Sequence, residues 1–185
     1  MLANYHASQK AGADGKATFT GLPEGPYEVC AQFSGSLLLD SCSWVNRPQA
    51  AFLHAGATLN VPVVLKQGTN ITVQVSDNSK LLTKETFPGQ KLRLEVSAKD
   101  AHSIPMLIAS PTANLRQFSA LVLADADLRI HVRSNDVQVA DPSGTRINMK
   151  DLSQFVPLHS PAVRSGVQPL AAALSVLTLQ VVGLQ

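Results

Sequence analysis

Short stretches in which apolar and polar residues alternate recur along most of this chain, and this period of two is typical of β-strands with one buried face. Residues 16–20 begin the pattern, and residues 27–33 repeat it with Tyr27, Val29 and Phe33 on the apolar face. No stretch has the apolar spacing of a long amphipathic helix. The pattern therefore predicts an all-β protein.

Turn-forming residues flank the first two predicted strands. Asp14-Gly15 supplies the positive backbone dihedrals of a tight turn. The sequence Leu-Pro-Glu-Gly over 22–25 fits the next reversal, since proline fixes φ and glycine closes the turn. We therefore expect the strands over 16–20 and 27–33 to pair in antiparallel fashion, with their aromatic face inward.

The run from Asp14 to Ala31 reads D-G-x-x-x-F-x-G-L-P-x-G-x-Y-x-V-x-A. This pattern resembles the carboxypeptidase regulatory-like domain, a transthyretin-like (prealbumin-like) β-sandwich that is an accessory module of many exported bacterial proteins. The likeness covers roughly residues 12–67. It implies a fold but no reaction, because the same module accompanies unrelated proteins, and the chain has no His/Glu metal motif of a catalytic carboxypeptidase.

Two features depart from the family pattern. Pro26 stands where the family has a residue with a backbone N–H, so we expect its strand to begin at a sheet edge or directly on the turn. The family also opens with one or two strands before the Asp-Gly turn, whereas only 13 weakly patterned residues precede Asp14 here. We interpret the first module as N-terminally truncated.

The alternation continues beyond the resemblance motif. Residues 51–54 and 58–65 are each predicted as a strand. Because proline cannot donate to a ladder, the second is expected to be an edge strand or to carry Pro62 at an unpaired position. A fresh alternation then starts. We therefore predict two domains, the carboxypeptidase regulatory-like module over 1–67 and a second domain over 69–185.

The second domain is predicted as an immunoglobulin-like sandwich. Its predicted strands are 70–76, 91–97, 107–109, 118–123, 128–133 and 137–139. Residues 134–136 are expected to join the last two strands as a hairpin, and residues 141–144 (Asp-Pro-Ser-Gly) match a type I turn. The fold class that follows is all-β, with two tandem antiparallel sandwiches of immunoglobulin-like or prealbumin-like kind.

The tail over 167–185 carries no charge and is long enough to cross a bilayer if it is helical. Against that interpretation, Leu177, Leu179 and Val181 occupy alternate positions, and no basic residue follows Arg164 to anchor a cytoplasmic end. We favour a final sandwich strand over a membrane anchor.

Composition narrows the possible partners. The net charge is +2 and 15% of the residues are charged, so the chain lacks the electrostatic footprint of a nucleic-acid-binding protein. No run of Lys or Arg favours anionic lipid either. The glycines stand singly at turns without the spacing of a phosphate-binding loop, which disfavours nucleotides, and we expect no cofactor.

The two cysteines bear on the compartment. Cys30 lies on the polar face of its predicted strand, where a buried thiol is not expected, so we favour a Cys30–Cys42 disulfide over two free thiols. Such a bridge would stabilise the fold by roughly 3 kcal/mol. It implies an oxidising compartment, which is extracellular, periplasmic or in the cell envelope, although residues 1–6 do not resemble a signal peptide.

Candidate catalytic and metal-binding residues are scattered. Asp125 and Asp127 could offer two oxygens to calcium, but they fit a polar turn before a strand better, because calcium takes about six to eight oxygens. Ser143 and Ser165 lack the strand-to-helix context of an activated nucleophile. The histidines have no pair at metal-binding spacing, and they are His6, His54, His102, His131 and His159. We predict no catalytic residue and no metal site.

Trp44 is the one residue singled out for ligand binding. It stands beside the predicted disulfide, and a sandwich can present an aromatic ring to a sugar if the indole is exposed. We favour the alternative, in which Trp44 covers the domain's own core. A carbohydrate-binding module is therefore the second functional hypothesis, and a hydrolase assembled from remote strands is the third.

The leading hypothesis is a non-catalytic accessory, structural or protein-interaction module of an exported bacterial protein. Its expected contact elements are exposed edge strands, which would bind another protein or domain by strand addition. Polysaccharide is the alternative partner.

Overall fold

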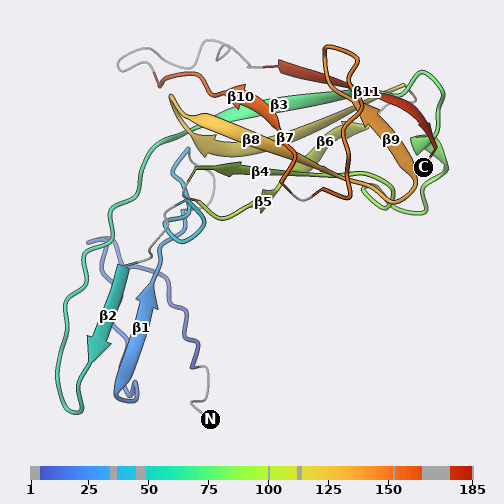
Figure 1. The fold of residues 1–185 in the computed structure, drawn as a ribbon. Coiled ribbons are helices and arrows are strands. Elements are labelled where there is room, and N and C mark those ends of the chain that lie inside the picture. The colour runs from blue at the N-terminus through green and yellow to red at the C-terminus, as the bar shows by residue number, and fades with distance from the viewer. Residues whose placement is uncertain are drawn as a thin grey trace.

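The computed structural model is an all-β protein, as the alternation predicted (Figure 1). It describes residues 5–33, 37–44, 49–99, 101–111, 114–151, 153–163 and 176–184. Within that part of the chain, the one helix is a short 3-10 turn, η1, over Leu82–Lys84.

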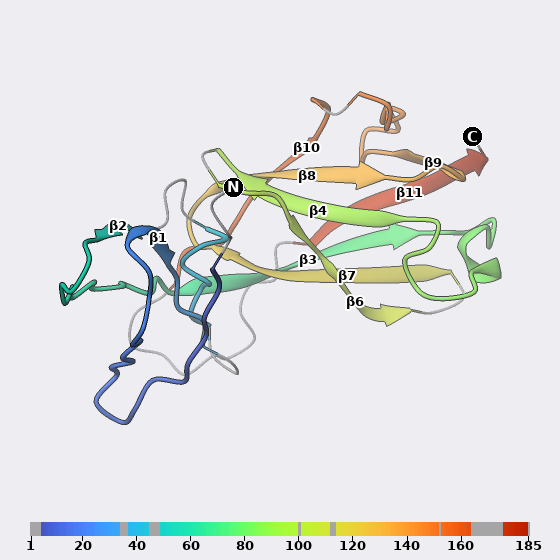
Figure 2. The same ribbon diagram turned by 90° about the horizontal axis from the view of Figure 1, so that it is seen from below.

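Nine of the described strands form a sandwich of two sheets (Figures 1 and 2). The four-stranded sheet has the order β10-β8-β4-β5, with β10 Val156–His159, β8 Asp127–Arg133, β4 Arg93–Ala98 and β5 Ile104–Pro105. The five-stranded sheet has the order β6-β7-β3-β11-β9, with β6 Leu107–Pro111, β7 Leu115–Leu123, β3 Gly68–Ser76, β11 Val176–Leu184 and β9 Val137–Ala140.

The core lies between the two sheets and follows from the alternation. On β3, Ile71, Val73 and Val75 are fully buried, and the polar residues between them face outward. Phe118 of β7 and Ile130 of β8 are among the largest side chains that are fully buried in this core. The strands predicted over these three segments are confirmed.

The C-terminal strand joins the five-stranded sheet. β11 pairs with β9 in antiparallel fashion and with β3 in parallel, from Val176 opposite Thr72 to Gln180 opposite Ser76. We expected a purely antiparallel sandwich. The parallel pairing of β11 with β3 shows that this expectation is wrong for that pair. The predicted final strand is confirmed over 176–184, whereas residues 167–175 and 185 lie outside the described residues. No described helix is long and apolar enough to cross a bilayer.

The predicted hairpin at 134–136 is wrong. β8 pairs with β4 and β10, whereas β9 pairs with β11, so residues 134–136 carry the chain from one sheet to the other. Ser134 Oγ accepts hydrogen bonds from the N–H groups of Asp136 and Val137. This local turn chemistry is the same in a hairpin and in a crossover, so the sequence could not separate them. The turn at 141–144 is confirmed by a hydrogen bond from Gly144 N–H to Asp141 O.

A two-stranded sheet projects from the end of the sandwich at which β3 begins (Figure 1). It pairs β1 (Gly25–Val29) with β2 (Gln49–Leu53) in antiparallel fashion. Residues 16–20, the expected partner of β1, do not form a strand, and neither do residues 58–65. Both predictions are wrong: residues 16–20 are all exposed, and a local alternation of apolar and polar residues does not establish a hydrogen-bonded neighbour.

Individual residues of β1 behave partly as expected. Pro26 is the second residue of a strand with one paired neighbour, so it does lie at a sheet edge. Tyr27 and Val29 are half-buried and alternate with exposed residues, but Phe33 is 59% exposed, so its inward placement is wrong. The Tyr27 hydroxyl donates to Pro23 O at 2.7 Å, which folds the preceding turn against the strand.

The segment before the sandwich contributes little buried surface of its own. No described residue in 5–33 or 49–67 is buried. The buried apolar residues before β3 are Leu39 and Trp44, and both pack in the same core cluster as the sandwich strands. The division into domains 1–67 and 69–185, and the truncation of the first domain, stay predictions.

Candidate functional site

Cys30 and Cys42 form a disulfide, with their Cα atoms 5.3 Å apart. Cys30 directly follows β1, so the bridge ties the end of that strand to the loop leading towards β2. The disulfide prediction is confirmed, and the alternative of two free thiols is excluded. We call the segment from Cys30 to Trp44 the disulfide loop; its residues 34–36 are not among those described.

Asp40 organises this loop. Its carboxylate accepts hydrogen bonds from the Cys42 N–H at 2.8 Å, the Gln32 side-chain amide at 2.6 Å and the Ser43 hydroxyl at 3.0 Å. Partial burial favours the neutral acid, but these hydrogen bonds outweigh burial and lower the pKa of Asp40. Asp40 is therefore ionised at neutral pH, and its oxygens are engaged within the loop.

The disulfide loop docks on the start of β3. Leu39 N–H donates to Lys66 O at 2.9 Å, and Gly68 N–H donates to Leu37 O at 2.6 Å, so the two segments run antiparallel. Leu39 is 2% exposed and packs so tightly that a Cβ on Gly68 would lie 2.7 Å from Leu39 Cδ2. This close approach requires glycine at position 68.

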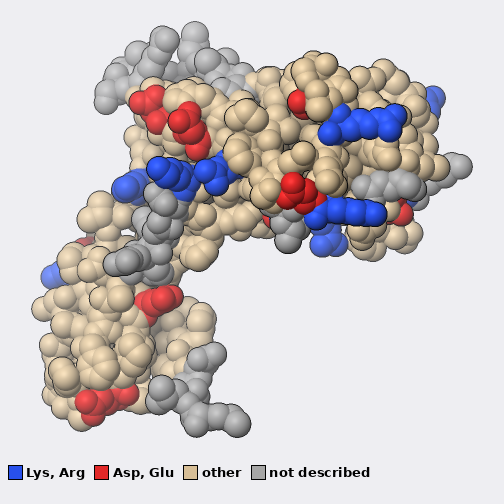
Figure 3. All heavy atoms as spheres, viewed as in Figure 1, with Lys and Arg blue, Asp and Glu red and all other residues tan. Residues whose placement is uncertain are grey.

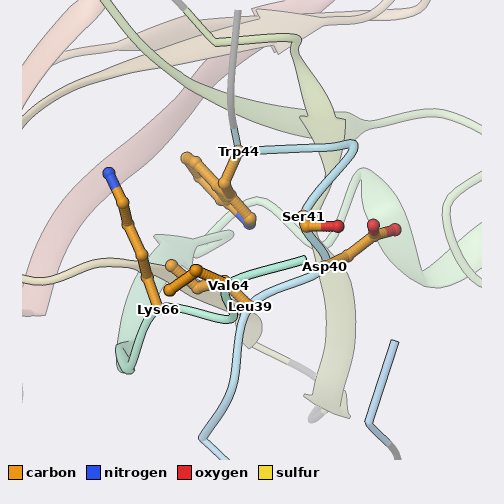
Figure 4. Close-up of a pocket in the computed structure, with 6 residues that line it drawn as sticks. All are labelled: Leu39, Asp40, Ser41, Trp44, Val64 and Lys66. Carbon is orange, nitrogen blue, oxygen red and sulfur yellow. The ribbon is translucent and has the colours of Figure 1, made fainter. Parts of the chain in front are cut away.

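Trp44 lies above Leu39 and Val64, as Figure 4 shows, and is 5% exposed. A sugar platform needs an exposed indole, so the assignment of Trp44 as a ligand-binding residue is wrong. The ring covers a hydrophobic core, as the other interpretation of Trp44 predicted. That core belongs to the sandwich and not to a separate N-terminal domain. The six residues labelled in Figure 4 line a cavity of about 10 Å³, which has room for one water molecule at most.

A groove of about 580 Å³ lies between the disulfide loop and the part of the sandwich formed by β5, β6 and β7. Its loop wall consists of Gln32, Phe33, Leu38, Leu39, Asp40, Ser43 and Trp44, and its sandwich wall consists of Ile104, Pro105, Leu107, Ser119, Ala120 and Leu121. Leu107 is 71% exposed and Phe33 is 59% exposed. A volume of this size lies within the range of roughly 300–1,000 Å³ that is typical of binding sites.

The lining of the groove suits binding more than bond chemistry. Among the described residues that line it, Asp40 alone is ionisable, and its oxygens already accept hydrogen bonds inside the loop. The groove therefore offers apolar contact surface with one fixed negative charge at its wall. The sequence predicted neither wall, because the two walls come from segments that only the fold brings together.

The acidic pair considered for calcium does not line this groove. His159 bridges the pair, with Nδ1 at 2.9 Å from Asp127 Oδ1 and Nε2 at 3.2 Å from Asp125 Oδ1, and these hydrogen bonds raise the pKa of His159. Asp125 and Asp127 therefore form the polar turn into β8 that the sequence favoured. In the described residues no three His, Cys, Asp or Glu side chains are arranged to hold a metal ion.

The sequence did not predict the polar contact between Ser97 and His131. Ser97 Oγ of β4 lies 3.2 Å from His131 Nε2 of β8, and His131 Nδ1 lies 3.2 Å from Gln154 O. Ser97 is 8% exposed, so its hydroxyl is not presented to a substrate. Ser143, considered as a nucleophile, donates to Asp141 within its turn at 2.6 Å. Residue 165 lies outside the described residues.

No model of a known protein family matches the chain, and neither a comparison with curated proteins nor one with solved structures found a match. The site is therefore interpreted from its own geometry.

Proposed function

We propose that this protein is a non-catalytic interaction module of an exported protein, and that the groove beside the disulfide loop binds a segment of a partner protein. The observation that carries the proposal is a concave apolar surface with Phe33 and Leu107 largely exposed. Large exposed apolar side chains gathered in a concavity are typical of protein-binding surfaces.

Export is supported by the Cys30–Cys42 disulfide, because disulfides persist in oxidising compartments and are rare in the cytosol. The resemblance of residues 12–67 to the carboxypeptidase regulatory-like domain points the same way, since that module accompanies exported bacterial proteins. We place the protein outside the cytoplasm, in the periplasm, the cell envelope or the exterior.

An extended peptide segment is the proposed occupant. β5 and β6, which border the groove, are each an edge strand of their sheet. Pro105 in β5 and Pro111 at the end of β6 cannot donate to a ladder, which limits strand addition there. Side-chain contacts with the apolar walls, supplemented by a few backbone hydrogen bonds, would therefore supply the affinity.

Selection of a displayed library of random linear peptides against the immobilised, oxidised protein tests this function. We expect enriched peptides that bind the wild type and lose about tenfold or more in affinity for Leu107→Glu, because a charge would then face the apolar wall. Leu59→Glu is the matched control, since Leu59 is 48% exposed and does not line the groove. Peptides that bind both variants equally would contradict the proposal, as would binding of polysaccharide with no peptide enrichment.

A further inference from the structure

Buried polar groups fix the long connection between β3 and β4, residues 77–92, which we call the β3–β4 loop. Asp77 is 2% exposed, and its carboxylate accepts the N–H groups of Leu81 at 2.9 Å and Leu82 at 2.7 Å. These bonds set the start of η1. Connections of this length in compact domains are mostly functional or disordered, and the buried carboxylate gives this one a defined shape.

A buried ion pair anchors the second half of the same loop. The side chains of Glu85 and Arg116 are 3% and 9% exposed and contact each other directly. Glu85 also accepts the Lys91 N–H at 2.7 Å, and Arg116 donates to Leu82 O. A buried ion pair contributes little net stability, because desolvation offsets the attraction. What it provides here is a fixed geometry for the loop.

The tip of the β3–β4 loop is a tight turn that presents Phe87. Gln90 N–H donates to Phe87 O at 3.2 Å, and Gly89 has φ +85°, as the third position of a type II turn requires. Phe87 is 54% exposed. Figures 1 and 2 place this loop, in green, at the end of the sandwich remote from β1 and β2.

The charge around this tip is basic. The loop and the first residue of β4 carry four basic residues, Lys80, Lys84, Lys91 and Arg93. Apart from Asp77, the acidic residue of this loop is Glu85, and its charge is neutralised by Arg116. On the neighbouring strands, Arg133 at the end of β8 pairs with Glu95 of β4 at 3.6 Å, and the connection from β8 to β9 adds one acid, Asp136. In the sequence the basic residues are too widely spaced to form a run, but three of them lie on this one loop and Arg93 directly follows it.

We propose that the β3–β4 loop docks the protein on an anionic lipid bilayer, with Phe87 at the interface and the basic residues over the headgroups. An aromatic ring on a projecting turn can enter a fluid interface without a matching cavity, whereas a protein partner would need a preformed pocket. Basic residues near an anionic surface supply the attraction. This surface is separate from the groove, so the two proposals can fail independently.

Co-sedimentation of the full, oxidised protein with phosphatidylcholine vesicles, and with vesicles that also contain phosphatidylglycerol, tests this proposal. We expect binding only to the anionic vesicles, weakened by added salt and reduced about tenfold in Phe87→Ala. Phe52→Ala is the matched control, because Phe52 is 51% exposed and lies on β2, far from this loop in the fold. Equal losses in the two variants, or no binding to either vesicle, would overturn the proposal.

A second measurement separates insertion from simple charge attraction. Phe87→Trp places a reporter at the tip, and its fluorescence should be quenched by brominated phosphatidylglycerol vesicles, while the buried Trp44 of the wild type should be unaffected. Lys80→Gln with Lys84→Gln should lower the affinity for anionic vesicles severalfold without changing the unfolding midpoint. Quenching of the wild type and of Phe87→Trp to the same degree would contradict insertion.

Discussion

Leu39 and Gly68 meet where the disulfide loop reaches the sandwich, and their contact leaves no space for a side chain at position 68. The sequence marks Gly68 only as part of a boundary, because the residue that forbids a Cβ there lies in another segment. The role of Trp44 cannot be predicted from its local sequence either, because that sequence fits both an exposed sugar-binding ring and a ring that covers the core. Burial, which depends on the whole fold, decides between them.

Gly68→Ala tests this contact. The added Cβ would lie 2.7 Å from both Leu39 Cδ2 and Val122 O, so we expect a loss of about 1–3 kcal/mol in the free energy of unfolding from overpacking. Gly183→Ala in β11 is the matched control, because a Cβ there meets no atom within 4 Å. Urea denaturation measures both, and equal stabilities for the two variants would contradict the close approach.

Asp40 gives the disulfide loop a pH dependence. Its pKa is lower in the folded protein than the ordinary value of 3.8, so the stabilisation by its ionised form is complete above that value and is lost as the pH falls through the folded-state pKa. We expect wild type to unfold at higher urea than Asp40→Asn at neutral pH, with the difference shrinking below about pH 4. A difference that stays constant through this acid range would exclude the role assigned to the carboxylate.

Among the secondary-structure elements, β3, β4, β7, β8 and β11 could be predicted because each has one apolar face against a single core. Residues 16–20 and 58–65 have the same alternation but form no strand. Alternation alone does not make a strand, because pairing needs a neighbouring backbone that local patterns do not reveal. The buried ion pair of the β3–β4 loop was likewise invisible, since Glu85 and Arg116 come from segments far apart in the chain.

Glu85→Ala tests how much the Glu85–Arg116 ion pair matters for the stability of the fold around the β3–β4 loop. The substitution leaves Arg116 buried without its partner, so we expect a loss of about 3–5 kcal/mol in the free energy of unfolding. Glu95→Ala is the control, because the Arg133–Glu95 pair is 3.6 Å apart and partly exposed, and such pairs contribute about 0–1 kcal/mol. Comparable losses in thermal unfolding of the two variants would contradict the burial difference.

Across the whole molecule, the buried apolar residues form one core between the two sheets of the sandwich. The N-terminal segment contributes two side chains of the disulfide loop, Leu39 and Trp44, to this core. On the face seen in Figure 3, the larger body has interspersed acidic and basic residues, and the smaller projecting part is mostly uncharged. The sequence predicted the fold class and the disulfide. It could not predict the groove, whose walls exist only because the loop docks on the sandwich edge.

Removal of the disulfide tests this arrangement at the scale of the whole protein. Cys30→Ser with Cys42→Ser should lower the free energy of unfolding by roughly 3 kcal/mol, because the unfolded chain regains the entropy that the bridge removes. Chemical denaturation of the oxidised wild type and the double variant measures the difference. Coincident unfolding curves would contradict a stabilising contribution of the bridge through the unfolded chain.

The disulfide loop is packed into the sandwich core through Leu39 and Trp44. Acrylamide quenching of the intrinsic fluorescence tests this packing most directly, because the chain has a single tryptophan. With Trp44 at 5% exposure, we expect weak quenching in the native protein and strong quenching after unfolding in urea. Native protein quenched as strongly as the unfolded chain would show that the loop is undocked and that the groove does not exist.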